Sequence, residues 1–263
     1  MNLHTCLLTA NDCYKAGKTI VPRGVMLHST GANNPKLCRY VAPDDGLLGT
    51  PSPNHWNQSG IAVCVHAFIG KLADGSVATY QTLPWTMRGW HCGRSGNDTH
   101  ISFEICEDGL ADPVYFWLVY REAVELTAYL CQRYALDPLQ DGVVLCHAEG
   151  YQRGIASNHV DVLHWFPKMG KSMDDFRADV ARELEDAMEE AKIRAIVREE
   201  LAEVEAERAK LPASDWAKPY IQQTVDRGLM AKNAQGTIDR PQAATTRQEL
   251  ATVANAIYQA IQE

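Results

Sequence analysis

The 263-residue sequence predicts an α/β fold, in which helices flank a central mixed β-sheet, followed by a long helix and a small α-helical unit. Three observations predict it. Short apolar runs of strand length recur between residues 24 and 147. Two of the β-rich runs flank an Asp-Gly turn, which predicts an antiparallel hairpin. Segments with helical spacing of apolar residues lie between and after these strands.

The composition excludes several classes of protein. A net charge of −8 gives no electrostatic case for binding nucleic acid or an anionic membrane. No apolar run approaches the roughly 20 residues that span a bilayer, so no membrane insertion is expected. The start, MNLHTCLLTANDCYKAGK, lacks the pattern of a signal peptide, so we expect synthesis in the cytoplasm.

The eight cysteines include no CxxC pair, which argues against a structural zinc knuckle. In a chain made in a reducing cytoplasm they are most simply thiols. The alternative is a secreted protein held by disulfides, although a chain of this length has enough core to fold without them.

Residues 24–31 read GVMLHSTG and predict a buried strand that presents His28 at its carboxyl end. That edge of an α/β sheet is a common place for ligands. The alternative is a strand-end histidine bonded only to backbone. Residues 31–60 are rich in Asn, Pro, Gly and Asp and predict a long loop, with one short helix near Lys36–Tyr40, that walls a substrate groove.

Residues 61–80, IAVCVHAFIGKLADGSVATY, form the predicted hairpin. His66 falls in the middle of its first strand, where it either lines a pocket or is a satisfied core histidine. The Trp- and Gly-rich residues 83–93 predict a loop carrying Trp90 and His91. Aromatic side chains on such a loop stack on carbohydrate or peptide, or else cover a core edge.

The segment HISFEICE predicts a strand in which Glu104 lies among apolar neighbours. Burying a carboxylate there is costly unless it faces a polar site, so Glu104 is a candidate general acid/base. The alternative is an edge strand with Glu104 in solvent. An amphipathic helix follows over residues 114–135, and residues 142–147 are a second apolar run that ends in histidine.

Residues 145–166 hold four candidate ligands, His147, His159, Asp161 and His164. Imidazole together with carboxylate suits zinc, and the two strand-end histidines raise the odds of a shared metal. Cys146 would point to the opposite face from its neighbour in an extended segment and is the weaker alternative.

The C-terminal third is predicted to be helical. A helix begins at Met173 with Ser172 as its N-cap and continues as a charged linker over 181–211, whose weak apolar stripe allows self-association. Residues 212–263 form a separate unit with one helix closed by Gly228 and a second that opens with the capping box of Thr246 and Glu249. Its core is marginal, so it needs further copies or partners.

Residues 24–180 resemble the zinc-dependent N-acetylmuramoyl-L-alanine amidases of the phage-lysozyme and peptidoglycan-recognition-protein type. The matching pieces occur in the family's order: the strand with His28, the hairpin VHAFIGKLADGSVATYQ, the Trp90-His91 loop, the strand ISFEI, and the stretch from His147 to Asp161. The resemblance implies that residues 1–180 are a catalytic domain for bacterial peptidoglycan.

The resemblance also implies roles. His28, His147 and Asp161 would bind Zn²⁺, although His159 and His164 are rivals of Asp161. Glu104 would move protons. His159 stands where the family commonly has a transition-state lysine, and the family's hairpin tyrosine has no counterpart. Substrate contacts would come from His91, His66 and Trp90.

The reaction implied is hydrolysis of the amide between N-acetylmuramic acid and L-alanine by zinc-activated water. The alternative is a non-catalytic peptidoglycan-binding protein of the same fold. A zinc endopeptidase of another fold would need an HExxH helix, which the sequence lacks.

Residues 212–263 resemble a single S-layer homology motif, from the opening DWAKPYI through Gly228 to the TRQE at Thr246. Such motifs bind secondary cell-wall polymers and usually occur in threes, so a lone motif implies oligomerisation. Trp216 and Arg247 would be the wall-binding residues. An amidase with such a tail and no signal peptide resembles a phage or prophage endolysin, made in the host cytoplasm and acting on the wall after release.

Overall fold

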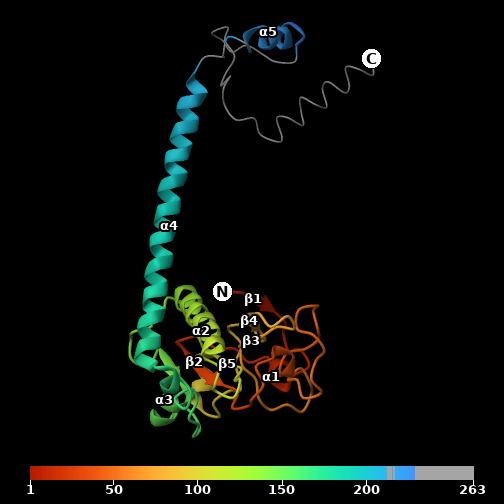
Figure 1. Cartoon of the computed structure of the whole chain (residues 1–263), viewed down its shortest axis with the longest axis vertical. Coiled ribbons are helices and arrows are strands. Elements are labelled where there is room, and N and C mark those ends of the chain that lie inside the picture. Colours follow the sequence, from red (N-terminus) through yellow and green to blue (C-terminus); the bar gives the residue numbers. More distant parts are fainter. Residues whose placement is uncertain (212–214, 216, 229–263) are drawn as a thin grey trace. The chain divides into compact units, whose positions relative to one another are not determined.

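One mixed sheet organises the first part of the chain (Figure 1). Its strands are β1 (Leu3–Thr5), β2 (Gly24–Ser29), β3 (Ala67–Lys71), β4 (Val77–Gln81), β5 (His100–Ile105) and β6 (Val144–Cys146). They lie in the order β1-β4-β3-β5-β2-β6. Only the hairpin pair β3 and β4 is antiparallel, and the other neighbours run parallel. The predicted fold class and the Asp-Gly hairpin are confirmed.

The computed structural model describes residues 1–211, 215 and 217–228. The chain divides into two units, residues 1–187 and 188–263, of which the first contains the sheet. Within the part of the chain that is described, no helix combines the length and the apolarity needed to cross a membrane.

Helix α2 (Pro113–Tyr134) packs along one face of the sheet. It begins where the Asp112 carboxylate accepts the N–H groups of Val114 and Tyr115, and it ends at Ala135, which has a left-handed conformation. This confirms the helix predicted over residues 114–135. Its buried face, including Phe116, packs in one core cluster with alternate residues of the central strands, among them Val25, Leu27, Ile101 and Phe103.

The alternation of side chains along each strand determines which polar residues lie on the sheet face opposite α2. Because successive side chains point to opposite faces of a strand, the residues that alternate with the α2-facing ones lie on the other face. His28 and Glu104 are among them. The parallel register of β2 and β5 pairs His28 directly with Glu104, so the sheet itself brings these two side chains side by side.

The first 24 residues contain two elements that the sequence did not predict. Strand β1 pairs parallel with β4, and helix α1 (Asp12–Ala16) begins at the Asn11 cap and ends at Gly17, whose φ is 62°. A three-residue strand and a five-residue helix are too short to display a period. The short helix expected near Lys36–Tyr40 is present as η1 (Leu37–Arg39).

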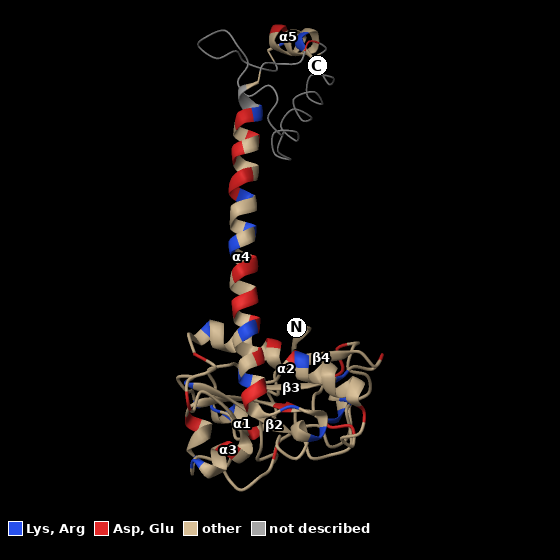
Figure 2. Cartoon of the chain, turned by 60° about the vertical axis from the view of Figure 1, so that its left-hand side comes forward, with Lys and Arg blue, Asp and Glu red and all other residues tan. Residues whose placement is uncertain are grey.

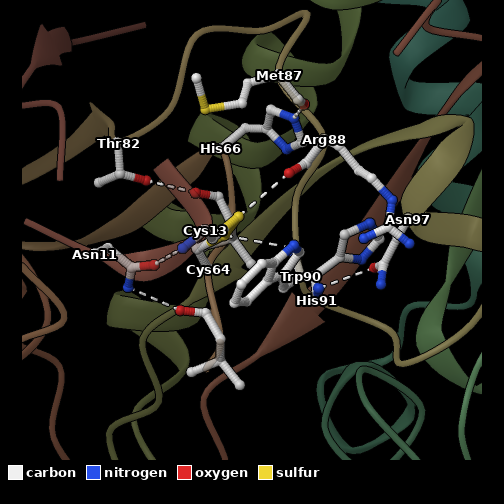
Figure 3. Close-up of a disulfide and its surroundings, with 12 residues drawn as sticks. Asn11, Cys13, Cys64, His66, Thr82, Met87, Arg88, Trp90, His91 and Asn97 are labelled. Carbon is white, nitrogen blue, oxygen red and sulfur yellow. Dashed lines mark hydrogen bonds between the residues drawn. A yellow bond between two sulfur atoms is a disulfide. The ribbon is translucent and has the colours of Figure 1, made fainter. Parts of the chain in front are cut away.

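Cys13 in α1 and Cys64 form a disulfide (Figure 3), so the expectation of eight thiols is wrong for this pair. The other six cysteines are free. Cys64 also exchanges backbone hydrogen bonds with Trp90, from Cys64 N–H to Trp90 O at 3.2 Å and from Trp90 N–H to Cys64 O at 3.1 Å. The disulfide therefore ties α1 to the segment that holds the Trp90-His91 loop.

Three shorter helices complete the first unit: η2 (Ser95–Asp98), α3 (His147–Gln152) and η3 (Phe166–Met169). Helix α4 (Met173–Lys210) begins where the Ser172 hydroxyl accepts the Asp175 N–H, as predicted. Its first turns bury Phe176 and Val180 in the core against α2.

Beyond these turns, residues 185–208 of α4 are exposed and rich in charged side chains, of which more are acidic than basic (Figure 2). The charged segment is thus helical, whereas the boundaries 1–180, 181–211 and 212–263 stay a prediction. Helix α5 (Lys218–Asp226) ends before Gly228, as predicted. Trp216, Arg247 and the second predicted helix of the tail lie outside the described residues.

Candidate active site

A cavity of about 770 Å³ opens on the sheet face opposite α2. Its lining includes five residues that the sequence analysis singled out: His28, Glu104, His147, His159 and Asp161. They come from the end of β2, from β5, from the first residue of α3 and from the loop after α3. The prediction that the two strand-end histidines meet is confirmed, since β6 runs parallel to β2 with Cys146 beside Leu27.

His28, His147 and Asp161 form a candidate metal site. Nδ1 of His28 lies 3.0 Å from Nδ1 of His147 and 3.2 Å from Oδ2 of Asp161. The third side, from His147 Nδ1 to Asp161 Oδ2, is 3.5 Å. For bonds of about 2.0–2.1 Å, the edges of a tetrahedral zinc site are about 3.3–3.4 Å long. The three donor atoms therefore have the separation that one tetrahedral ion requires.

Each histidine of this group has a partner on its other ring nitrogen. Nε2 of His147 lies 3.2 Å from the Ser157 hydroxyl, and Nε2 of His28 lies 2.8 Å from Nδ1 of His91. Metal-binding histidines commonly use their second nitrogen in this way, which fixes the ring and its tautomer. In both histidines, Nδ1 is therefore the atom that faces the other two residues of the candidate site.

The charge states also suit a cation. Burial lowers the pKa of His28, which favours the neutral imidazole that a metal needs. Burial raises the pKa of Asp161, but hydrogen bonds with His147 and His28 outweigh it and hold the pKa well below its usual value. Two imidazoles and one carboxylate are a donor set that zinc accepts.

Glu104 reaches the cavity from β5 as a half-buried residue. Its Oε2 is buried and has no hydrogen-bond partner among the described residues. Burial raises the pKa of Glu104 well above its usual value, and the nearby charges of Asp161 and Glu107 raise it further. A bound cation would lower this pKa again, because it stabilises the carboxylate. The alternative of a solvent-facing Glu104 on an edge strand is excluded, because β5 lies between β3 and β2.

His159 lies at the cavity wall with its ring centroid 4.6 Å from that of His147. It is exposed, so its ring nitrogens are open to a ligand. His164 instead bonds through Nε2 to Oε1 of Glu107 at 2.9 Å, and that oxygen also accepts the Gly31 N–H. Of the three candidates for the third ligand, Asp161 is therefore favoured, because it lies close to both His28 and His147.

His66 is fully buried and does not line the cavity. Nδ1 lies 3.1 Å from the Ser102 hydroxyl and 3.0 Å from the Ser102 N–H, and Nε2 lies 2.7 Å from the Met87 carbonyl oxygen. With both nitrogens engaged it has no atom for a substrate, which corrects the expectation of a substrate contact. Trp90 and His91 do line the cavity.

Sequence reasoning missed Ser157 and Glu107. Glu107 lies only three residues after Glu104, just beyond the end of β5, and this proximity in the sequence is a signal that could have identified it. Ser157 lies in a segment of small and polar residues that has no period, and no local pattern marks it.

A family model described as N-acetylmuramoyl-L-alanine amidase matches residues 17–162, more than half of the chain. The matched range contains His28, Glu104, His147, His159 and Asp161. No curated protein matches the chain.

Solved structures that match this chain include Staphylococcus aureus hydrolase AmiA in complex with its ligand, at 18% identity and a TM-score of 0.49, covering 71% of this chain and 84% of that one. The PlyG catalytic domain matches at 20% identity and a TM-score of 0.48, covering 70% and 96%. The catalytic domain of XlyA matches at 21% and 0.43, covering 68% and 99%.

Proposed function

The chain belongs to the N-acetylmuramoyl-L-alanine amidase family, and on this premise we propose that it is a zinc-dependent endolysin whose ligands are His28, His147 and Asp161. As a member of that family it hydrolyses the amide between N-acetylmuramic acid and L-alanine in bacterial peptidoglycan. The observation that carries the zinc proposal is the triangle of donor atoms with sides of 3.0, 3.2 and 3.5 Å.

Three protein ligands leave a fourth tetrahedral position for water or substrate, as in catalytic zinc sites. Zinc, when bound, supplies a Lewis acid that polarises the scissile carbonyl and lowers the pKa of water to about 7. The remaining chemistry belongs to the side chains that line the cavity.

Glu104 is proposed to move the protons. Glu104 lines the cavity and its Oε2 has no hydrogen-bond partner among the described residues, so the carboxylate can accept a proton from the attacking water and hold it as a carboxylic acid. When the C–N bond breaks, the same group returns this proton to the nitrogen of L-alanine. The products are the lactyl carboxylate of muramic acid and a free peptide amine.

His159 is proposed to donate a hydrogen bond to the oxygen that becomes negative in the transition state. It stands beside His147 on the exposed side of the site, where a carbonyl oxygen could approach it. Trp90 contributes a half-buried aromatic wall to the cavity and is proposed to contact the substrate.

The test measures the zinc content of the purified protein and identifies the bond that it cuts in peptidoglycan. Digestion of purified peptidoglycan is expected to release new N-terminal alanine and no new reducing sugar ends, and the purified protein is expected to hold one zinc. His28→Ala should lose both zinc and lysis. New reducing ends would show a glycosidase, and intact walls with zinc bound would support the non-catalytic alternative.

For the tail, we propose that residues 212–263 bind the wall through Trp216 and Arg247, with the charged part of α4 as the linker. The support is the match of the opening DWAKPYI and Gly228 to an S-layer homology motif. We further propose that the chain acts on the wall after release from the cell and self-associates through the linker or tail.

This proposal is tested with Glu104→Gln protein, which leaves the walls intact. The full chain is expected to pellet with purified walls, whereas a chain ending at Leu211 is not. Equal pelleting would remove wall binding from the tail. Sedimentation equilibrium of both proteins measures the self-association separately.

A further inference from the structure

We propose that His91 is a positioning residue that fixes the tautomer and ring orientation of His28, and is not a contact for the substrate. The inference rests on the proposed zinc site, because it concerns how one ligand of that site is held. It follows from the 2.8 Å separation of His28 Nε2 and His91 Nδ1, with ring planes inclined by 76°.

Only one proton can lie between two ring nitrogens at this distance, and the metal site decides where it is. If His28 offers the lone pair of Nδ1 to the ion, its single proton must be on Nε2. His28 Nε2–H then donates to Nδ1 of His91, which accepts. His91 must therefore be neutral and carry its own proton on Nε2.

This second proton, on Nε2 of His91, has no acceptor among the described residues, and Nε2 itself is buried. A buried donor without an acceptor destabilises the fold, and the core histidine His66 avoids this cost because both of its nitrogens are hydrogen-bonded. A histidine kept with one nitrogen unpaired points to a function for the other nitrogen, the one that faces His28.

Hydrogen bonds to the backbone of the loop fix the position of His91. Asn97 is 5% exposed, and its side-chain oxygen accepts the N–H of His91 at 2.9 Å (Figure 3). The same oxygen accepts the N–H of Cys92 at 3.0 Å. The backbone of Trp90 is paired with Cys64, one of the disulfide residues. A Cβ added at Gly89 would lie 3.1 Å from the rings of both His66 and His91, so glycine leaves room for this packing.

This arrangement also explains why His91 is a poor substrate contact although it lines the cavity. Its Nδ1 is occupied by His28 and its Nε2 is buried. The matching role at His147 is filled by the Ser157 hydroxyl. Loss of such outer partners typically weakens metal affinity by about 10–100-fold.

The experiment compares His91→Leu with His91→Asn in the full-length protein. The two replacements have nearly the same size, but only asparagine has a side-chain oxygen close to the place of Nδ1. We expect His91→Leu to bind Zn²⁺ about 10–100-fold more weakly in a titration against a chelator, and His91→Asn to stay within a fewfold of wild type. Ser157→Ala removes the corresponding partner of His147 and should weaken Zn²⁺ binding in the same range.

A second measurement, by NMR, detects the hydrogen bond between His28 Nε2 and His91 Nδ1 directly. In ¹⁵N-labelled zinc-loaded wild type, His28 should show a hydrogen-bonded proton on Nε2, and His91→Leu should lose this signal. Should His91→Leu not fold, His91→Phe keeps a ring without an acceptor and replaces it.

Wild-type zinc affinity in the folded Leu or Phe variant, with zinc lost in His28→Ala, would overturn the inference and leave the zinc proposal standing. A wild-type protein that binds no zinc would overturn both.

Discussion

The disulfide between Cys13 and Cys64 should be a large contributor to the stability of the first unit. It closes a loop of 51 residues. In the chain-entropy account, a loop of that length removes about 14 cal/mol/K of entropy from the unfolded chain, which is about 4 kcal/mol at 25 °C. For a unit of this size, about 4 kcal/mol corresponds to a fall in Tm of about 8–16 °C.

The assay compares thermal unfolding of the oxidised protein with that of the Cys13→Ser, Cys64→Ser double variant. The double variant should melt about 8–16 °C lower, and its Tm should not respond to reductant. Thiol counting under denaturing conditions should find the six free cysteines before reduction and all eight after it. Eight thiols before reduction, or equal Tm values for the two proteins, would refute the reasoning.

Three further outcomes are expected. Glu104→Gln should keep one zinc and lose about 10²–10⁴-fold in turnover, since it removes only proton transfer; near-normal turnover would exclude Glu104 as the shuttle. Burial lowers the pKa of His66 to about 4. The unfolded chain therefore binds a proton at His66 below about pH 6.5 and the folded chain only below about 4, so stability should fall by about 3 kcal/mol as pH drops through that window. Denaturant unfolding from pH 4 to 7 measures the slope, which His66→Gln should make shallower. Phe116→Ala, which empties a fully buried site, should cost about 3–5 kcal/mol in the same assay while zinc binding persists.

The parts of the fold that could be predicted are those with a local signature. The alternation of apolar side chains in residues 100–105, the Asp-Gly turn of the hairpin and the helical spacing of residues 114–135 each need only neighbouring residues to be read. The meeting of His28 and His147 followed from the same local reasoning, because both end short apolar strands of one sheet.

The parts that could not be predicted depend on contacts between distant residues. The disulfide joins Cys13 to a residue 51 positions away, and eight cysteines allow many pairings. His66 could be a pocket residue or a core residue until Ser102 and Met87 were seen to bond both of its nitrogens. His91 likewise has a local pattern that suggests a substrate loop, whereas its partner is His28.

The shortest strands of the sheet have a consequence for how the protein behaves at high concentration. Both edges of the sheet, β1 and β6, are only three residues long. An edge strand exposes unpaired N–H and C=O groups on which another molecule can add a strand, and short edges limit this. Deleting residues 1–6 would uncover the five-residue strand β4 in place of β1. A chain trimmed in this way should aggregate between sheets as its concentration rises, although its cavity is untouched.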